Sequence, residues 1–164
     1  MERNLRGVVI TLSDRAYKGI YEDKSGDFIL NWLKEELKFL KVEKFLIPDE
    51  KKFLKKIFKS SLKKGVNLII TTGGTGFGKR DITPEVTEKF IKKKAYGISE
   101  YLRLKGLEET PFSVLSRGIA GSNGKTFIIN LPGSVKAVQN NLKNLKEILP
   151  HLINSLLGIE EHHL

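Results

Sequence analysis

The chain has 164 residues, a length at which one compact domain buries about two thirds of the surface that its unfolded form exposes. It contains no cysteine, which excludes disulfide bonds, thiolate catalysis, cysteine-ligated zinc and cysteine-held iron–sulfur clusters. The formal charge of +10 at pH 7 favours anionic partners, but its sign does not distinguish nucleic acid, phosphorylated small molecules and anionic membrane surfaces. We expect a single domain over residues 1–164 and a cytoplasmic location, because no apolar segment is long enough for a signal peptide or a membrane span.

Predicted strands and helices alternate through the first half of the chain. β-Branched and apolar residues predict a buried strand over Arg6–Leu12, and apolar residues at helical spacing predict a helix over residues 27–40. The same two patterns recur in residues 42–47 and in the segment after Pro48. Residues 66–72 carry the strongest strand pattern and end at glycines, which is typical of a central strand covered on both faces.

The next elements are predicted by their boundary residues. A helix should begin at Thr83-Pro84, since threonine is a good N-cap and proline is favoured at the first helical position. Residues 97–107 predict a short helix. The Asn123-Gly124 pair predicts a hairpin turn before a strand over Thr126–Leu131.

The last segment completes an alternating order. Apolar residues at helical spacing predict a helix over residues 134–157, which Pro150 should bend or divide. Together the elements predict an α/β domain of three layers, in which a mostly parallel sheet has helices on both faces and the hairpin adds an antiparallel edge. Ligands of such sheets bind beyond the carboxyl ends of the strands, and the polar, glycine-bearing segments follow the predicted strands. We therefore expect one shared pocket at that edge.

A glycine-rich loop follows the third predicted strand. The sequence TTGGTGFGKRD contains four glycines and three threonines. Glycines let main-chain N–H groups approach an anion closely, threonine hydroxyls add donors, and Lys79 and Arg80 could neutralise phosphate charge. The spacing matches neither a P-loop nor a dinucleotide-binding glycine pattern, so a purely structural turn is the alternative.

Two aspartates are placed to face the same pocket. Asp49 follows the second predicted strand and Asp81 ends the glycine-rich loop, so the pair could bind Mg²⁺ together with substrate phosphates. Each aspartate has a structural alternative. Asp49 could cap the helix that follows it, and Asp81 could pair with Arg80 or form a turn before Thr83.

Two further polar segments lie at the same edge of the predicted sheet. Ser134 opens the last predicted helix and Lys136 follows it, which offers a hydroxyl, free N–H groups and a cation to a second anion, with a plain helix cap as the alternative. Ser13, Asp14 and Arg15 could add an anion contact or a carboxylate for a ligand amine, or could form a surface turn.

The three histidines predict no further site. His151, His162 and His163 lack the spacing of a metal site, and nothing in the sequence places them near the glycine-rich loop for a Ser-His-Asp arrangement.

Four segments taken together resemble the successive motifs of the molybdopterin adenylyltransferase family, the MogA/MoaB group, in the family's order: TLSDRAYKGIYEDKSG, LIPDE, TTGGTGFGKRDITPEVT and NLPGSVKAV. The resemblance extends over residues 6–142. It implies a compact α/β domain, usually a homotrimer, which uses Mg²⁺ and ATP to attach AMP to the terminal phosphate of molybdopterin and releases pyrophosphate. It also implies a molybdenum insertase as a possible protein partner.

The resemblance assigns roles to individual residues. Asp49 and Asp81 match the family's two essential aspartates, which serve catalysis and bind the metal. The nucleotide and its phosphates would be held by Thr72, Gly73, Gly74, Thr75, Gly76, Ser13, Asp14 and Arg15. The molybdopterin would be held by Pro132, Gly133, Ser134 and Lys136.

Two alternative functions stay open. A non-catalytic homologue of the MoaB type, which binds molybdopterin or assembles partners, would keep the fold but would tolerate loss of the two aspartates. Nucleic-acid binding would use the basic charge, but most aromatic residues lie on predicted core stripes and the lysine clusters are expected to be solvated helix faces. We therefore expect neither a nucleic-acid nor a membrane partner.

Overall fold

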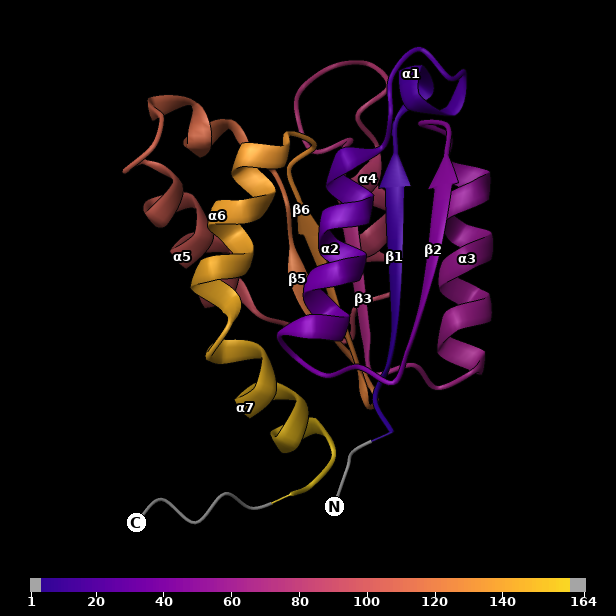
Figure 1. The fold of residues 1–164 in the computed structure, drawn as a ribbon, viewed down its shortest axis with the longest axis vertical. Helices are drawn as coiled ribbons and strands as arrows, with labels where there is room; N and C mark the ends of the chain where they lie inside the picture. The colour runs from indigo at the N-terminus through magenta and orange to yellow at the C-terminus, as the bar shows by residue number, and fades with distance from the viewer. Residues whose placement is uncertain (1–3, 160–164) are drawn as a thin grey trace.

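The computed structural model describes residues 4–159 and is built on one six-stranded sheet (Figure 1). The strands are β1 (Arg6–Leu12), β2 (Lys41–Ile47), β3 (Leu68–Thr72), β4 (Lys93–Lys94), β5 (Ala120–Asn123) and β6 (Thr126–Leu131). They lie in the order β2-β1-β3-β6-β5-β4. The first four in this order are parallel, and β5 and β4 pair antiparallel at one edge. The predicted parallel sheet with an antiparallel edge hairpin is confirmed.

Helices cover both faces of the sheet. They are α1 (Asp14–Tyr17), α2 (Lys24–Glu35), α3 (Lys51–Lys63), α4 (Thr83–Glu88), α5 (Tyr96–Gly106), the 3₁₀ helix η1 (Pro111–Leu115), α6 (Val135–Leu145) and α7 (Ile148–Leu156). Leu68 and Phe127 pack with α2, α5, α6 and α7, while Ile69 and Ile128 pack with α3 and α4 on the opposite face. Successive strand residues point to opposite faces, so central strands that are buried on both faces produce the predicted three layers. Within residues 4–159, none of these helices is both long and apolar enough to cross a membrane.

The helix predicted over residues 27–40 lies closer to the N-terminus. α2 begins after its N-cap Asp23, whose carboxylate accepts a hydrogen bond from the Gly26 N–H at 2.9 Å. The chain leaves the helix after Glu35, and Lys38, at φ 55°, turns the main chain so that Phe39 returns to the core. Leu40, which the helical spacing placed on the buried stripe, is 69% exposed, so that part of the prediction is wrong.

The predicted division of the last helix is present, but it lies before the proline. α6 ends at Leu145 and α7 begins at Ile148, whereas Pro150 is the third residue of α7. Proline has no N–H to donate to the carbonyl of Lys146, and its ring would clash with that carbonyl in a continuous helix. The other predicted elements are found within two or three residues of their expected bounds, and only α1, β4 and η1 were not expected.

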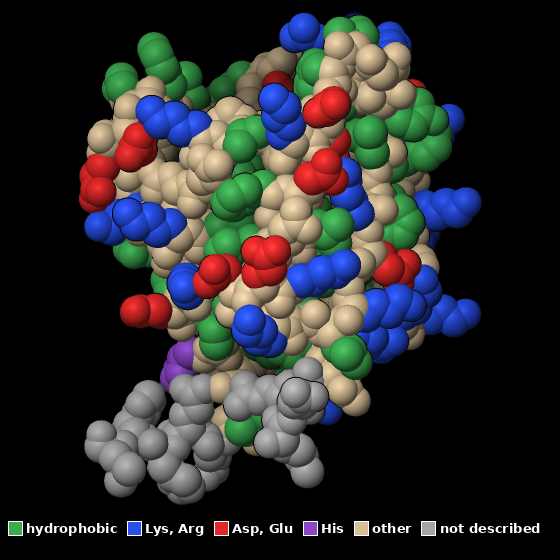
Figure 2. All heavy atoms as spheres, viewed as in Figure 1, with side chains coloured by type: hydrophobic (Ala, Val, Ile, Leu, Met, Phe, Trp, Pro, Cys, Tyr) green, Lys and Arg blue, Asp and Glu red, His purple; other side chains and the backbone are tan. Residues whose placement is uncertain are grey.

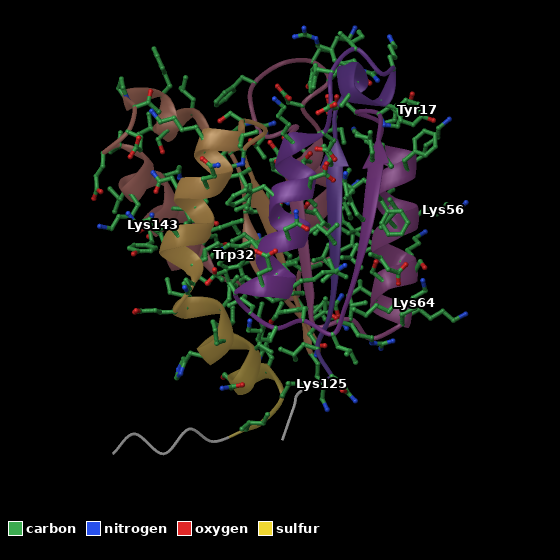
Figure 3. All side chains as sticks on the ribbon, in the orientation of Figure 1. Tyr17, Trp32, Lys56, Lys64, Lys125 and Lys143 are labelled. Carbon is green, nitrogen blue, oxygen red and sulfur yellow. The ribbon has the colours of Figure 1, made fainter. Side chains whose placement is uncertain are left out.

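The outer side of α3 is strongly basic. Seven lysines of α3 and its C-cap give this surface its charge: Lys51, Lys52, Lys55, Lys56, Lys59, Lys63 and Lys64. Figure 2 shows blue side chains gathered on the right, over α3, and Figure 3 shows Lys56 and Lys64 on this helix, away from the sheet. Leu54 and Phe58 on the opposite side of α3 are fully buried. The lysines are thus the solvated face of an amphipathic helix.

The contact between β5 and β4 leaves no room for a side chain at Gly121. A Cβ there would lie 2.4 Å from the Lys93 carbonyl oxygen, so we expect Gly121→Ala to reduce the free energy of unfolding by about 2 kcal/mol. Gly97 is the matched control, because a Cβ in this first turn of α5 meets no atom within 4 Å. Gly97→Ala should leave stability unchanged or raise it by up to about 1 kcal/mol. Urea unfolding of both variants measures the difference, and equal midpoints would contradict the close packing.

Candidate functional site

The carboxyl ends of the parallel strands meet at one edge of the sheet, where α1 lies at the top of Figure 1. A cavity of about 930 Å³ opens at this edge. Most of the residues that the sequence singles out line it: Ser13, Asp14, Arg15, Asp49, Thr72, Gly73, Gly74, Asp81, Gly133 and Ser134. We call this space the aspartate cavity.

A second cavity, of about 400 Å³, adjoins the first. It lies against α5, η1 and α6, and its wall is mainly apolar, with Leu102, Phe112 and Leu115 among the lining residues. The remaining residues of the predicted site line this space: Thr75, Gly76, Pro132 and Lys136. Ser134 lines both cavities. The predicted pocket is therefore divided in two, and we call the second space the apolar cavity.

The glycine-rich loop is shaped by two glycines with left-handed main chain. Gly73 has φ 94° and Gly74 has φ 68°, and residues other than glycine rarely adopt such conformations. A Cβ on Gly73 would lie 2.3 Å from the Leu12 carbonyl oxygen. A Cβ on Gly74 would lie 2.3 Å from Thr83 Oγ1 and 3.4 Å from Asp49 Oδ1. The glycines thus bring the end of β3 against the end of β1 and beside the Asp49 carboxylate.

The loop presents main-chain donors unevenly. The Gly73 N–H donates to the Leu131 carbonyl at 3.1 Å and is unavailable to a ligand. The N–H groups of Gly74, Thr75 and Gly76 have no acceptor within residues 4–159. The phosphate-binding capacity of the loop therefore lies in these three residues rather than in Gly73.

Thr83 anchors the loop instead of capping α4. The N-cap of α4 is Ile82, so the predicted role of Thr83 as the cap is wrong by one residue. Its buried hydroxyl donates to the Gly73 carbonyl at 2.9 Å, and its N–H donates to the Gly74 carbonyl at 3.1 Å. Because the Thr83 hydroxyl bonds to the preceding loop, it does not cap the N–H groups at the start of the helix. The cap rule failed here for this reason.

Asp14 and Asp49 are joined by reciprocal hydrogen bonds. The Asp14 N–H donates to Asp49 Oδ2 at 2.8 Å, and the Asp49 N–H donates to Asp14 Oδ1 at 3.0 Å. Arg80 donates to Asp14 through Nε at 2.7 Å and through Nη2 at 2.8 Å. Asp14 thus engages both its oxygens within the protein, and Ser13-Asp14-Arg15 is the start of a short helix rather than a surface turn.

The two carboxyl groups of this pair are perturbed in opposite directions. The hydrogen bonds from the Arg80 guanidinium lower the pKa of Asp14. Burial, followed by repulsion from Asp14 and Asp81, raises the pKa of Asp49. A cation bound beside Asp49 would relieve this repulsion, so the site favours a positively charged ligand.

The structural alternatives for Asp49 and Asp81 are largely removed. Glu50, not Asp49, is the N-cap of α3. Arg80 pairs with Asp14, not with Asp81. Asp81 does make one local turn bond, because its Oδ2 accepts from the Gly78 N–H at 2.8 Å. Within residues 4–159, Oδ1 of each aspartate has no donor and stays available to a ligand.

These oxygens suit Mg²⁺ that arrives with phosphates. Mg²⁺ is commonly held by one or two carboxylates together with phosphate oxygens and water, and Asp49 and Asp81 supply the two carboxylates from one cavity wall. No group of three or more His, Cys, Asp or Glu side chains in the described part of the chain could hold a metal on its own. His151 lies on α7 and lines neither cavity, while His162 and His163 fall outside the described residues.

The segment between the two cavities is fixed by hydroxyl groups. The Thr72 hydroxyl donates to the Pro132 carbonyl at 2.6 Å, and the Ser25 hydroxyl donates to the Gly133 carbonyl at 2.7 Å. The hydroxyl of Thr72 is therefore occupied, although the residue lines the aspartate cavity. Ser25, the second residue of α2, was not singled out by the sequence, because a serine at the start of a helix gives no sign of the distant carbonyl that it binds.

Ser134 and Lys136 at the start of α6 already have partners within the protein. Ser134 caps α6 by accepting from the Ala137 N–H at 3.2 Å, as the plain-cap alternative predicts. Lys136 forms an exposed ion pair with Glu109 at 3.3 Å beside the apolar cavity. The N-terminal end of α6 thus borders the apolar cavity, where N–H groups and the Lys136 cation are accessible.

Ser13 is held in place by Tyr21, which also lines the aspartate cavity. It caps α1 and forms a hydrogen bond of 2.7 Å with the Tyr21 hydroxyl. The Arg15 guanidinium lies 5.3 Å from the centre of the Tyr21 ring. Tyr21 lines the cavity and is a residue that sequence patterns did not indicate.

Comparisons with known proteins identify the family to which the chain is similar. The family model described as probable molybdopterin binding domain matches residues 8–151. A molybdopterin adenylyltransferase of Helicobacter pylori is 40% identical over 152 residues, which cover 92% of this chain and 86% of that protein. The Drosophila melanogaster protein cinnamon, a molybdenum cofactor synthesis protein, is 35% identical over 151 residues, which are 92% of this chain but only 25% of that protein.

A solved structure extends the likeness to three dimensions. The molybdopterin biosynthesis enzyme MoaB of Thermus thermophilus superimposes with a TM-score of 0.85 at 37% identity, and the match covers 94% of this chain and 97% of that chain. The residues matched by the family model include every residue of both cavities named above.

The opposite pKa shifts predict opposite effects on stability. The raised pKa of Asp49 means that its ionised carboxylate destabilises the fold. We therefore expect Asp49→Asn to unfold at a higher temperature at pH 7. Its free energy of unfolding should rise by up to about 1 kcal/mol after allowance for solvent screening. This gain should disappear as the pH falls below about 4, where the carboxyl group is protonated.

Asp14→Asn is the matched comparison. Because the pKa of Asp14 is lowered, its ionised carboxylate stabilises the fold at pH values above the ordinary pKa of an aspartate. This variant should therefore unfold at a lower temperature at pH 7. The difference should be lost as the pH falls through the lowered pKa. Thermal unfolding at pH 7 and at a series of pH values down to about 2 measures both effects. A loss of stability at pH 7 in Asp49→Asn would contradict the strained carboxylate.

Proposed function

Because the chain belongs to the molybdopterin binding domain family, we propose that it is a molybdopterin adenylyltransferase, which transfers AMP from ATP to the terminal phosphate of molybdopterin and releases pyrophosphate. The observation that carries this proposal is that Asp49 and Asp81 line one cavity beside the glycine-rich loop, each with a carboxylate oxygen free. The name of the Helicobacter relative, an enzyme of this activity, supports it.

The two cavities suit the two substrates. The aspartate cavity offers carboxylates for Mg²⁺ and N–H groups for phosphates, so we assign it to the metal-bound triphosphate. The apolar cavity offers a mainly apolar wall with Arg103, Asn140 and Asn141, which suits a flat heterocycle with a polar edge, so we assign it to the pterin. Ser134 borders both spaces, and the reacting phosphates would meet there.

In the proposed reaction an oxygen of the pterin phosphate forms a bond to the α-phosphorus of ATP. The bond from that phosphorus to the oxygen bridging to the β-phosphorus breaks, and pyrophosphate leaves with its electron pair. When bound, Mg²⁺ would neutralise charge on the phosphates. The chain itself positions the groups: Gly74, Thr75 and Gly76 offer main-chain donors, and Ser134 places the start of α6 beside the reacting phosphates.

Removal of either free carboxylate tests this function. We expect Asp49→Asn and Asp81→Asn each to reduce the rate of pyrophosphate release from molybdopterin, ATP and Mg²⁺ by about 100-fold or more. Each variant would lose a carboxylate that binds Mg²⁺, and the metal would no longer be held where it neutralises the phosphates. Glu43→Gln on the edge strand β2, outside both cavities, is the control and should keep the wild-type rate. Wild-type turnover in both aspartate variants would reject the role of the two carboxylates, whereas a wild-type protein that releases no pyrophosphate would favour a non-catalytic binding protein.

We also propose a homotrimer. α5 and η1 expose apolar side chains, with Leu104 65% and Val114 56% exposed. We expect another subunit to cover such an apolar patch. Figure 2 shows green side chains at the upper left, where Figure 1 places η1. The cytoplasmic location and the insertase partner stay predictions.

Light scattering tests the assembly. The wild-type protein should have three times the mass of one chain, and Val114→Asp should shift it toward the monomer, because a charge would be buried without a partner. Lys56→Asp, on the solvated face of α3, is the control and should leave the mass unchanged. A monomeric wild-type protein would contradict the trimer.

A further inference from the structure

Arg117 contacts the middle and the last residue of the glycine-rich loop while lining neither cavity. Its N–H donates to the Thr75 carbonyl at 2.9 Å. Its Nε donates to the Gly76 carbonyl at 2.7 Å, and its Nη2 donates to the carbonyl of Asp81 at 3.1 Å. One residue thus closes the segment 75–81 into a fixed arc.

The guanidinium of Arg117 is itself held in place. Its Nη1 pairs with the Glu85 carboxylate in the first turn of α4, and this contact lowers the pKa of Glu85. The ring of Phe77 lies over the guanidinium, with 5.3 Å from its centre to Cζ. A planar fork of donors can bind two carbonyls and a carboxylate at once, which a lysine ammonium cannot reproduce.

The segment has few other anchors. Gly78 and Asp81 bond to each other, but these bonds stay inside the segment. Among the described residues, the Arg80 pair with Asp14 is the other polar contact that ties this segment to a distant part of the chain. A glycine-rich segment gains much conformational freedom when anchors are lost, so the arc depends on Arg117.

We propose that Arg117 is a positioning residue, which holds the Asp81 carboxylate where the metal-bound phosphates are received. This inference rests on the proposed function and adds a residue to it. Arg117 bonds to the Asp81 main chain and not to its carboxylate, so it sets the position of that group rather than its charge. The core clusters do not include Arg117, so the fold should survive its replacement.

Proteolysis measures the arc without any enzyme assay. Trypsin cuts after Lys79 and Arg80, which are exposed on the segment. We expect Arg117→Lys and Arg117→Ala to be cut there about tenfold faster than the wild type, at an unfolding temperature that changes little. Arg6→Lys is the matched control, since Arg6 also donates to main-chain carbonyls, those of Lys64 and Gly65, at a distance from both cavities. Its cleavage after Lys79 and Arg80 should match the wild type.

Metal dependence links the arc to Asp81. In Arg117→Lys the Mg²⁺ concentration for half-maximal pyrophosphate release should rise about tenfold, while the rate at saturating Mg²⁺ falls much less, since charge at the site is unchanged. Arg117→Ala should show a larger rise, which free guanidinium ion partly reverses. A variant that was merely less folded would lose rate at every Mg²⁺ concentration and would not respond to guanidinium.

The two measurements separate the two proposals. Unchanged trypsin cleavage in both Arg117 variants would overturn the positioning role, whatever the enzyme does. Faster cleavage together with an unchanged Mg²⁺ dependence would also overturn it, because the arc would then not govern the metal site. A wild-type protein that releases no pyrophosphate would reject adenylyl transfer, and the positioning of Asp81 for that reaction would fall with it, while faster cleavage would still show that Arg117 anchors the loop.

Discussion

The site depends on the close approach of two main-chain segments at the carboxyl edge of the sheet. At Gly73 the chain leaving β3 passes so near the Leu12 carbonyl that any side chain would overlap it. This contact brings the glycine-rich loop against the end of β1 and places Gly74 beside Asp49. Thr83 then secures the loop with two hydrogen bonds to it. The aspartates of separate loops face one cavity because these segments are packed at main-chain distance.

Charge is distributed in opposite ways over the surface and the site. The chain is strongly basic, and the lysines of α3 point to solvent, whereas the aspartate cavity gathers Asp14, Asp49 and Asp81. The guanidinium of Arg80 pairs directly with Asp14, and the pKa of Asp49 stays raised because burial outweighs the attraction of Arg80. A basic protein attracts anionic substrates over its whole surface, and a local acidic cluster selects those that carry a bound cation. The net charge alone did not reveal this second feature.

The sheet could be predicted from the sequence because its strands are marked by local pattern. Buried strands such as β3 and β6 are dominated by β-branched and apolar residues, and the helical segments between successive strands predict parallel pairing through right-handed crossovers. Other features depend on partners distant in sequence. Arg80 was considered as a phosphate contact or as a local partner of Asp81, but it binds Asp14, 66 positions away. The helical spacing continued to Leu40, but Lys38 adopts positive φ and the chain has left the helix by that point. Pattern also predicted one pocket, since nothing local marks where α5 and η1 form a second cavity.

The reciprocal bonds between Asp14 and Asp49 have a consequence for how substitutions combine. Each residue uses its own N–H to hold the other's carboxylate, so the loops after β1 and β2 form one closed ring of hydrogen bonds. Removing one carboxylate frees the main chain from which the other projects. The energies of changes at these two positions are therefore not additive, and the pair behaves as one unit whose members do not have separate contributions.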